Sequence, residues 1–581
     1  MISMDPHNEE AYSIVVFGAS GGLAKKKVFP ALWALFRENR LPQGTKIFTF
    51  TRSPLQTKTY RLQILPYMEL DKHRDPKKYN LFWTTVHCVQ GEYDKPENYV
   101  ALTEAMVHQE TKHNQVRANR IFYLALPPIV FDQVTLNVSR KCSSTTGWNR
   151  IIVEKPFARD DISYKAFQTS LCNCFRESQI YLMDHLLSRQ VMQNFFALRY
   201  SNHLWAETLN HRHVAAVMIS IKCELPVSVN RADYFNQFGI IRDLMTNHMI
   251  QMLAMLAMDQ PYANTADDLR AERLKVLRQV LTPNIGDVVL AQYRNNRRET
   301  DPAKCGYTEH TYIPKDSFTP TFALVVLHIN NRRWTGVPFI LRAGKALNDT
   351  KSEVRIQYKP VDCDTFHSDS TDIRNELVLR SFPTEEVFMR MRLKRQGEDI
   401  CLRESEINLR VDDRGPKGLQ GLPGYLLNVF QGDQTLFMRS DEQCEIWRIF
   451  SPVLATIDSD RPRPLHYDFG SRGPLLAYRK AERAGFVFFA TDEWHQSEET
   501  LEYTVKNSKQ LIGPHTALKP SNPSPLSVPF GSNPFRAIVA HVAVWSLAPH
   551  DGVDAALIQQ MSNVNRLRKC DGSTFNSGNE V

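Results

Sequence analysis

The sequence predicts an α/β domain with a parallel sheet, followed by an α+β domain and a disordered C-terminal tail. An apolar, β-branched run from Tyr12 to Phe17 leads through a glycine-rich turn into a helical stretch from Leu23 to Asn39, which indicates a strand, a tight turn and a helix. A long helical pattern from Gly239 to Met258, with strand-like runs after it, favours an α+β second domain. Prolines gather between Pro520 and Pro534, and neither helices nor central strands tolerate such a composition.

Length and composition place the chain among globular proteins with more than one domain. It has 581 residues, of which 42% are hydrophobic and 23% are charged. At about 150 residues per domain this length gives roughly two to four domains. The average composition sets aside wholesale disorder, collagen-like repeats and coiled coils. The net charge of +8 is small for this length and favours an anionic small ligand without implying nucleic acid.

Several absences in the sequence narrow the cellular setting. The segment Met1 to Glu10 is polar and acidic, so it lacks the basic flank and apolar run of a secretory signal. No run approaches the roughly 18 apolar residues of a membrane span. The 10 cysteines are scattered, and Cys172 and Cys174 form a CxC rather than a CxxC pair, which predicts neither a zinc framework nor a disulfide scaffold. We expect a cytoplasmic protein with reduced thiols, no membrane contact and no bound metal.

Further strand-like runs complete the predicted organisation. In the first domain they are separated by helix-length segments, which predicts repeated β-α-β units, and they are Lys46 to Thr51, Arg120 to Leu126 and Arg150 to Val153. In the second domain they are Phe322 to Ile329, Val354 to Tyr358 and Glu376 to Arg380. We expect the domain boundaries to be 11–183, 184–497 and, for the tail, 498–581.

The turn after the first strand has the spacing of a dinucleotide-binding fingerprint. Gly18, Gly21 and Ala24 lie between strand and helix, where small residues let a pyrophosphate approach the positive helix N-terminus. We interpret the first domain as an α/β Rossmann coenzyme domain, although turn glycines without a ligand give the same pattern. Arg52 follows the second strand, where an NAD enzyme usually has an acidic residue. A guanidinium there suits the 2′-phosphate of NADP, and an ordinary surface arginine is the alternative.

Four residues combine suitable chemistry with a structural alternative. His248 is either a histidine of the protein core or a general base whose tautomer a carboxylate fixes. Asp184 is a candidate carboxylate, but sequence spacing does not show that it reaches His248. Lys155, at the end of a buried-looking strand, and Lys345, beside Gly344, are each either solvated lysines or ligands near a strand end.

Six segments of the sequence together resemble one enzyme family. They are GASGGLAKKKVFPALWALFRENRLP, RIFYLALPP, WNRIIVEKPFARD, MDHLLSRQVMQN, YFNQFGIIRDLMTNHMIQML and GVPFILRAGKALN. Through them, most of residues 12–495 resembles the glucose-6-phosphate dehydrogenases. The resemblance implies a Rossmann domain and an α+β domain with a large, mostly antiparallel sheet, in a homodimer or homotetramer. It also implies NADP-dependent oxidation of C1 of glucose 6-phosphate, the first step of the oxidative pentose phosphate pathway.

The resemblance implies a role for each candidate residue. His248 is the base that removes the C1 hydroxyl proton, and Asp184 orients it. The residues implied to bind substrate are Lys155, His185, Arg189, Glu224, Asp243 and Lys345. Those implied to bind the reacting NADP are Gly18, Ala19, Ser20, Gly21, Gly22, Leu23, Ala24, Lys25, Arg52, Phe131 and Lys155. A second, structural NADP is implied at Arg342, Lys351, Arg355, Arg380, Arg390, Arg472 and Trp494.

Some positions depart from the family pattern. Gly22 stands for an aspartate, Leu186 and Phe131 for tyrosines, Arg189 for a lysine, Thr350 for an arginine and Phe382 for a glutamine. The proposed catalytic pair is retained, but the substrate pocket has lost hydroxyl and charged groups. Two further functions therefore stay open. One is a catalytically weak paralogue retained for NADP binding or subunit interaction, and the other is a dehydrogenase of another sugar.

Overall fold

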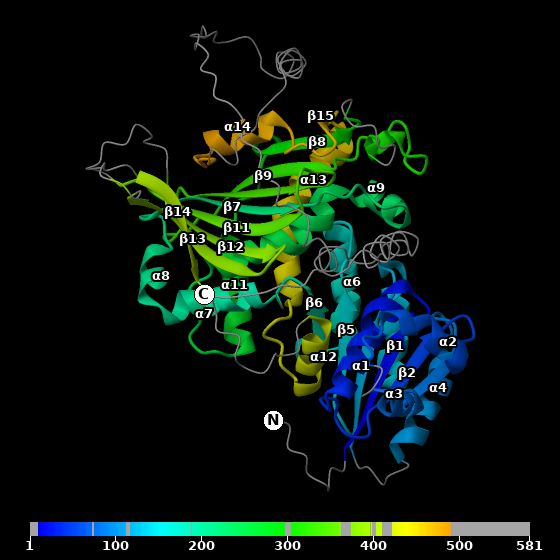
Figure 1. Cartoon of the computed structure of the whole chain (residues 1–581). Coiled ribbons are helices and arrows are strands. Elements are labelled where there is room, and N and C mark those ends of the chain that lie inside the picture. The colour runs from blue at the N-terminus through cyan, green and yellow to red at the C-terminus, as the bar shows by residue number, and fades with distance from the viewer. Residues whose placement is uncertain are drawn as a thin grey trace, which may run out of the picture.

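The computed structural model describes residues 10–489 except 72–74, 112–116, 188, 297–303, 362–373, 395–396, 398–401 and 410–420. The predicted tail, 498–581, and Trp494 lie outside the described residues. Two sheets organise the described chain, one at the lower right and a larger one at the upper left of Figure 1. Among the described residues, no helix combines the length and the apolar character needed to cross a bilayer.

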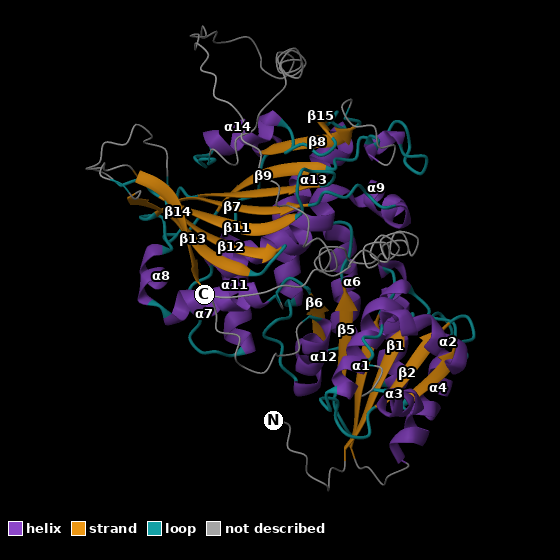
Figure 2. Cartoon of the chain, viewed as in Figure 1, coloured by secondary structure: helices purple, strands orange, loops and turns teal. Residues whose placement is uncertain are grey.

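The first sheet has six parallel strands in the order β3-β2-β1-β4-β5-β6 (Figure 2). Its strands are β1 (Glu10–Phe17), β2 (Lys46–Thr51), β3 (Val86–Gln90), β4 (Arg117–Leu124), β5 (Asn149–Glu154) and β6 (Ile180–Met183). The helices of this part are η1 (Ala24–Val28), α1 (Phe29–Arg37), α2 (Thr57–Ile64), η2 (Leu65–Tyr67), α3 (Pro76–Thr84), α4 (Pro96–Glu110), η4 (Pro128–Val130), α5 (Phe131–Asn137), η5 (Val138–Cys142), α6 (Asp161–Cys174) and η6 (Glu177–Gln179). This strand order is that of a Rossmann domain, so the predicted α/β fold is confirmed.

Alternation along β1 explains why the sheet is covered on both faces. Val15 and Phe17 belong to one buried apolar cluster, whereas Ile14 and Val16 belong to another. Since successive side chains of a strand point to opposite faces, the two clusters lie on the two sides of the sheet. A strand buried on both faces needs the continuous apolar run that the sequence shows from Tyr12 to Phe17.

Within the described residues the second sheet has nine strands in the order β14-β13-β12-β11-β7-β10-β9-β8-β15. They are β7 (Val214–Lys222), β8 (Val288–Arg294), β9 (Phe322–His328), β10 (Pro338–Gly344), β11 (Lys351–Tyr358), β12 (Glu376–Phe382), β13 (Glu386–Lys394), β14 (Leu402–Leu409) and β15 (Leu465–Asp468). The pairs β7–β10 and β8–β15 are parallel, and the other neighbours are antiparallel. The large, mostly antiparallel sheet implied by the resemblance is confirmed.

The helices of the second part include the segment that carries His248. They are α7 (Gln190–Ser201), α8 (His203–Thr208), η7 (Val229–Arg231), α9 (Ala232–Ile240), η8 (Ile241–Met249), α10 (Ile250–Ala257), α11 (Ala266–Gln279), η9 (Ile285–Asp287), η11 (Tyr307–Glu309), α12 (Leu422–Gln431), α13 (Ser440–Asp460) and α14 (Leu475–Arg483). The helical pattern predicted from Gly239 to Met258 is present. Gly239 itself has a φ of 70°, which is not helical and kinks the chain near the end of α9. Beyond this kink η8 is a π-helix, and it packs against β7 and β10.

The segment Leu422–Ser440 returns from the second part of the chain to the first sheet. Helix α12 packs against α1, and Met438 forms a bridge to Leu182 of the edge strand β6. Figure 1 shows α12 near β5 and β6 of the first sheet. Because this segment crosses back, the expected boundaries 11–183 and 184–497 stay predictions.

Gly18 supplies a test of this fold. A Cβ at Gly18 would lie 2.3 Å from the carbonyl oxygen of Ala125, and the φ of Gly18 is +74°. Gly18→Ala is therefore expected to lower the free energy of unfolding by about 1–3 kcal/mol in urea denaturation. Gly22→Ala is the matched control, since nothing lies within 4 Å of a Cβ built there, and we expect a change within about 0.5 kcal/mol. Equal losses in the two variants would contradict the turn geometry.

Candidate functional site

The loop after β1 has the geometry of a pyrophosphate cradle. The N–H of Gly18 donates to the carbonyl of Phe50 at 3.1 Å, and the N–H of Gly21 donates to the carbonyl of Gly18 at 2.9 Å. Ala19 is buried, whereas Ser20 to Gly22 are exposed at the start of the helical turn. Exposed backbone at a helix N-terminus fits the pyrophosphate of a dinucleotide.

The other residues predicted for the coenzyme differ in their exposure. Arg52 is exposed just beyond β2, and its guanidinium lies 5.8 Å from the ring centroid of Tyr93. Phe131 is 1% exposed, and its ring centroid lies 5.4 Å from that of Phe167. Arg52 can therefore meet a ligand in this conformation. Phe131 belongs to the core, where its ring has no surface to offer a coenzyme.

Strand register brings Lys155 beside Asp184. Strands β5 and β6 are parallel, with Glu154 opposite Met183, so the next residue of each strand leaves the sheet at the same edge. The Nζ of Lys155 lies 2.7 Å from the Oδ2 of Asp184, with side-chain exposures of 8% and 0%. The alternative of a solvated lysine is therefore wrong for Lys155.

His248 completes the contacts of the Asp184 carboxylate. The Nδ1 of His248 lies 2.9 Å from the Oδ1 of Asp184, and the N–H of Leu186 donates to the same oxygen at 3.0 Å. An ionised carboxylate only accepts hydrogen bonds, so Nδ1 of His248 carries the proton. The other ring nitrogen, Nε2, then accepts. The structure thus shows the contact that sequence spacing left undecided.

Charge keeps Asp184 anionic. Burial alone would raise the pKa of Asp184, but the charge of Lys155 and the contact with His248 outweigh burial and hold this pKa well below its usual range. Burial lowers the pKa of Lys155, and the charge of Asp184 opposes that shift. The result is a buried anion that fixes the tautomer of an imidazole, which is the arrangement of a general base.

The π-helix η8 supplies a second carboxylate to the same place. The backbone carbonyl of Asn247 accepts a hydrogen bond from Lys155. The Oδ1 of Asp243 lies 2.9 Å from the Nη2 of Arg231, whereas Oδ2 is buried with no hydrogen-bond partner among the described residues. A buried oxygen without a donor costs free energy, and a ligand hydroxyl would supply that donor.

These elements enclose a cavity of about 270 Å³. Of the residues predicted to act on substrate, it is lined by Lys155, His185, Asp243 and His248. Asp184 lies behind Lys155 and His248 and is fully buried. The structure thus gathers residues that lie far apart in the sequence around one small cavity. No three His, Cys, Asp or Glu side chains of the described residues are grouped to hold a metal ion.

Three predicted substrate residues lie elsewhere. Arg189, Glu224 and Lys345 are not among the described residues that line this cavity. The Nη1 of Arg189 lies 3.4 Å from the Oε1 of Glu385. Glu224 and Lys345 follow the carboxyl ends of β7 and β10, which are parallel neighbours. Their roles at the substrate stay predictions.

The departures from the family pattern have local structural roles. Leu186 is 6% exposed, and Phe382, on β12, is 6% exposed as well. The Oγ1 of Thr350 accepts a hydrogen bond from the N–H of Glu224 at 3.0 Å. These side chains complete packing and a turn, and none supplies a positive charge to a bound anion.

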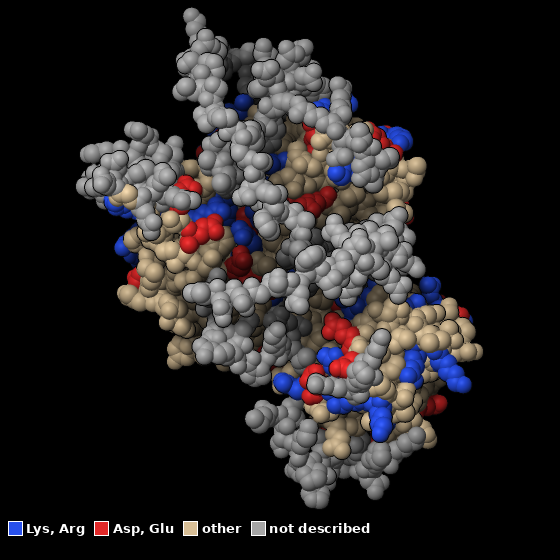
Figure 3. Space-filling model, in the orientation of Figure 1, with Lys and Arg blue, Asp and Glu red and all other residues tan. Residues whose placement is uncertain are grey.

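A second group of cations lies on one face of the large sheet. Most of its members are paired: Arg355 lies 2.9 Å from Glu376, and Arg390 lies 3.0 Å from Glu406. Figure 3 shows blue and red side chains interspersed over the area where β12 and β13 lie in Figure 1. Arg342 differs, because its Nη1 reaches only the hydroxyl of Tyr478, at 3.4 Å, and its buried Nε has no partner among the described residues.

Comparison with known proteins identifies the family. The model of the glucose-6-phosphate dehydrogenase NAD binding domain matches residues 15–194, and that of the glucose-6-phosphate dehydrogenase C-terminal domain matches residues 196–495. The chain belongs to the glucose-6-phosphate dehydrogenase family. The glucose-6-phosphate 1-dehydrogenase of Drosophila melanogaster is 44% identical over 490 residues, which are 83% of this chain and 92% of that protein. The glucose-6-phosphate 1-dehydrogenase 2 of Mus musculus is 40% identical over 489 residues, 84% of this chain and 94% of that protein.

Solved structures agree with this family assignment. A glucose-6-phosphate dehydrogenase in complex with its substrate glucose 6-phosphate has a TM-score of 0.78 and 32% identity, covering 83% of this chain and 99% of that one. The glucose-6-phosphate 1-dehydrogenase of Mycobacterium avium has a TM-score of 0.70 and 26% identity, covering 84% of this chain and 99% of that one. The family predicted from the sequence is confirmed.

The structure adds site residues of this glucose-6-phosphate dehydrogenase family member that sequence reasoning missed. Arg231, Tyr234 and Asn247 line the cavity, as does Glu154. Burial lowers the pKa of Lys27 against the opposing charge of Glu154, which places this lysine of η1 beside the site. Glu154 directly precedes Lys155 and Asn247 directly precedes His248, so their place in these motifs was the signal that could have found them. Nothing local in the sequence singled out Arg231.

The pair of His185 and Glu154 makes stability depend on pH. The Nε2 of His185 lies 3.0 Å from the Oε2 of Glu154. Burial disfavours protonation of His185, but the carboxylate outweighs burial and raises the pKa of His185. The imidazolium therefore stabilises the fold fully below the unfolded pKa of about 6.5. This contribution is lost as pH rises through the raised pKa.

We expect the free energy of unfolding of the wild type, relative to Glu154→Gln, to fall as pH rises above about 6.5 and through the raised pKa of His185. Urea denaturation at each pH measures it. The matched control removes the titrating group: the free energy of unfolding of His185→Gln, relative to the double variant His185→Gln with Glu154→Gln, should not change over the same pH range. A wild-type advantage that is constant with pH would contradict the pairing.

Proposed function

We propose that this chain catalyses the NADP-dependent oxidation of C1 of glucose 6-phosphate to 6-phosphogluconolactone. Membership of the glucose-6-phosphate dehydrogenase family supports the activity, and one solved relative is in complex with glucose 6-phosphate. The observation that carries the proposal to individual residues is the buried carboxylate of Asp184, which contacts Lys155 and His248 at the wall of one cavity.

The proton path follows from the contacts of His248. Its Nε2 takes the proton of the C1 hydroxyl, and Asp184 stabilises the imidazolium through Nδ1. The electrons of the O–H bond form the C1 carbonyl of the lactone as the C1 hydrogen leaves with its electron pair. NADP, when bound, supplies the acceptor for that hydride. Lys155 keeps Asp184 anionic during the transfer because it remains paired with Oδ2.

The cavity walls supply groups for the sugar. The unpartnered Oδ2 of Asp243 is suited to accept a hydrogen bond from a sugar hydroxyl. The Glu154 carboxylate raises the pKa of His185 and so favours its protonated form, and we assign His185 to the phosphate. We assign Arg189 and Lys345 to the phosphate and Glu224 to a sugar hydroxyl as part of the same proposal. The losses at Leu186, Thr350 and Phe382 should weaken substrate binding more than turnover.

The coenzyme is held by the first domain. We assign the segment from Gly18 to Lys25 to the coenzyme, because its exposed backbone at Ser20 to Gly22 fits a pyrophosphate, and the exposed Arg52 is placed to meet a 2′-phosphate. The face that carries Arg342, Lys351, Arg355, Arg380, Arg390 and Arg472 is our proposed site for a second NADP. Its support is the buried Nε of Arg342, which has no partner among the described residues and would gain one from an anion.

The cellular setting belongs to the same proposal. We infer that the enzyme acts in the cytoplasm, as a homodimer or homotetramer, in the first step of the oxidative pentose phosphate pathway. Gel filtration with light scattering distinguishes the two assemblies.

His248→Asn tests the general base. The amide of asparagine can still donate to Asp184, but it cannot accept the proton of the C1 hydroxyl at neutral pH. We expect turnover to fall by about 10²- to 10⁴-fold in an NADPH absorbance assay. Binding of NADP, followed by fluorescence, should be unchanged, because His248 lies outside the first sheet. A folded variant with wild-type turnover would remove His248 from this role.

Arg52→Ala tests the coenzyme preference. Removing the guanidinium should weaken NADP by about 1.5–3 kcal/mol in calorimetric titration and leave NAD unchanged, because only NADP carries the 2′-phosphate. Arg61→Ala is the matched control, since Arg61 also lies over a tyrosine ring, at 4.5 Å from the centroid of Tyr79. If the second site also binds NADP, the titration should give two NADP per chain, and only one of them should bind more weakly in Arg52→Ala. Equal losses for both coenzymes would exclude Arg52.

A further inference from the structure

The phenol of Tyr425 contacts the backbone of Asp184. Tyr425 lies on α12 and is 0% exposed, and its hydroxyl donates a hydrogen bond to the carbonyl of Asp184. The N–H of Leu187 donates to the same carbonyl at 3.1 Å. The ring of Tyr425 also meets the ring of His185 edge-on, with centroids 6.1 Å apart. The buried side chain of Tyr425 thus contacts both Asp184 and the next residue, His185.

Residues that follow Tyr425 in the chain form hydrogen bonds along the edge strand β6. The Nε2 of Gln434 donates to the carbonyls of Glu177 and Ile180, at 2.9 and 2.8 Å. The N–H of Met438 donates to the carbonyl of Leu182 at 3.0 Å. Because β6 is the last strand of its sheet, these bonds satisfy backbone groups that its neighbour β5 does not reach. The segment Leu422–Ser440 therefore fixes the strand that ends at Asp184.

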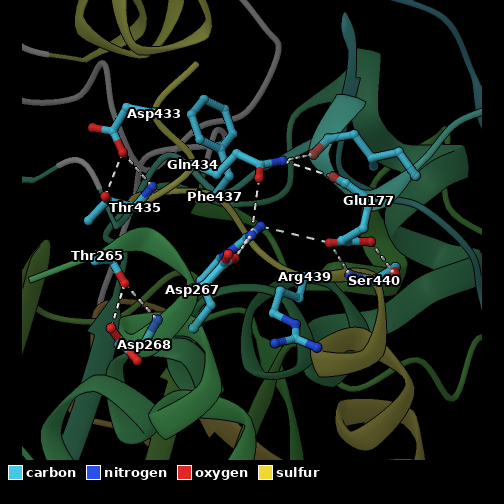
Figure 4. Close-up of polar contacts among 12 residues, drawn as sticks. Glu177, Thr265, Asp267, Asp268, Asp433, Gln434, Thr435, Phe437, Arg439 and Ser440 are labelled. Atoms are coloured by element: carbon cyan, nitrogen blue, oxygen red, sulfur yellow. Dashed lines mark hydrogen bonds and ion pairs between the residues drawn. The ribbon is translucent and has the colours of Figure 1, made fainter. Parts of the chain in front are cut away.

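Two buried arginines of α11 fix this segment in turn. Arg270 is 2% exposed and donates to the Oε1 of Gln434 at 3.1 Å. Figure 4 shows the polar contacts around Gln434, Glu177 and Ser440. Arg273 donates to the carbonyl of Phe437 at 2.7 Å. The ring of Phe437 lies between those of Tyr425 and Tyr181, with centroids 5.0 and 4.8 Å away. Helix α11 thus holds a segment whose tyrosine reaches Asp184.

We propose that Tyr425 is a positioning residue for the Asp184–His248 pair. Its hydroxyl sets the backbone of Asp184 just after β6 ends, and so sets where the carboxylate meets Nδ1 of His248. The inference rests on the proposed function for its effect on turnover. Its structural core, that Tyr425 tunes the hydrogen bond between Asp184 and His248, does not depend on the identity of the substrate.

The rate of proton transfer to a general base is sensitive to small displacements of that base. A shift of about 1 Å in a group that positions a base can cost about 10²-fold in rate. The carboxylate of Asp184 accepts from Lys155, His248 and the N–H of Leu186, so a rotated backbone would lengthen at least one of these bonds. The hydroxyl of Tyr425 bonds to the backbone carbonyl of Asp184 and not to its carboxylate, so removing this hydroxyl should displace the Asp184–His248 pair without removing a reacting group.

Tyr164→Phe is the matched control for Tyr425→Phe. Tyr164 is also 0% exposed, and its hydroxyl donates to a backbone carbonyl of the same segment, that of Ser440, at 2.8 Å. Each variant therefore loses one buried phenol hydroxyl and one hydrogen bond to a carbonyl. No contact is found between Tyr164 and Asp184 in the described part of the chain, so only Tyr425→Phe should disturb the pair.

Two measurements on the full chain test the proposal. The first is the low-field proton NMR signal of the His248 ring N–H that is bonded to Asp184, assigned by its loss in His248→Asn. We expect this signal to shift in Tyr425→Phe and to stay in place in Tyr164→Phe. The second is steady-state oxidation of glucose 6-phosphate with NADP. We expect kcat to fall about tenfold in Tyr425→Phe, with both KM values within about twofold of wild type, and to be unchanged in Tyr164→Phe.

The outcomes separate the two proposals. A wild type that does not oxidise glucose 6-phosphate overturns the proposed function, and the NMR comparison then decides the role of Tyr425 alone. An unchanged signal in Tyr425→Phe, or equal changes in the two tyrosine variants, overturns the positioning role. If Tyr425→Phe fails to fold, 3-fluorotyrosine at position 425 keeps the ring and the hydroxyl and strengthens the donation to the Asp184 carbonyl. An unshifted His248 signal in that variant overturns the positioning role.

Discussion

The carboxylate of Asp184 sits fully buried at the end of an edge strand, and the surrounding structure is arranged to keep it charged there. A buried anion without partners would lose its charge or destabilise the fold. Asp184 instead accepts from Lys155 of its own sheet, from His248 of the other part of the chain, and from the N–H of Leu186. Strand β5 and the π-helix η8 each place a donor against this one carboxylate, which follows the end of β6.

Neither part of the chain can build this site by itself. The first sheet supplies Lys155 and Asp184 through the register of β5 and β6, while η8 supplies His248 and Asp243. The segment Leu422–Ser440 returns to the first sheet and closes its free edge. The Asp184–His248 pair therefore lies where the two parts of the chain meet, and the segment Leu422–Ser440 that joins them is a natural place to control its geometry.

The retained and altered residues of the family pattern fall in different places. The residues that we propose for proton transfer, Asp184 and His248, are hydrogen-bonded to each other, so a change in either would leave the other without a partner. Leu186 and Phe382 are buried in packing roles, and Thr350 caps the backbone of Glu224. Substrate affinity can change at such positions without disturbing the pair. One buried oxygen of Asp243 has no hydrogen-bond partner among the described residues, which supports our assignment of this carboxylate to a sugar hydroxyl.

The sequence by itself determined the strand, glycine turn and helix of the coenzyme domain, the helical pattern that carries His248, and the family motifs. These features are local, because apolar periodicity and turn chemistry act over a few residues. Only the tertiary structure decided that Asp184 meets His248, 64 residues away, and Tyr425, 241 residues away. It also decided that Phe131 is buried and that Arg231 holds Asp243. The physical reason is that strand register and the docking of distant segments depend on the whole packed core, which no local pattern encodes.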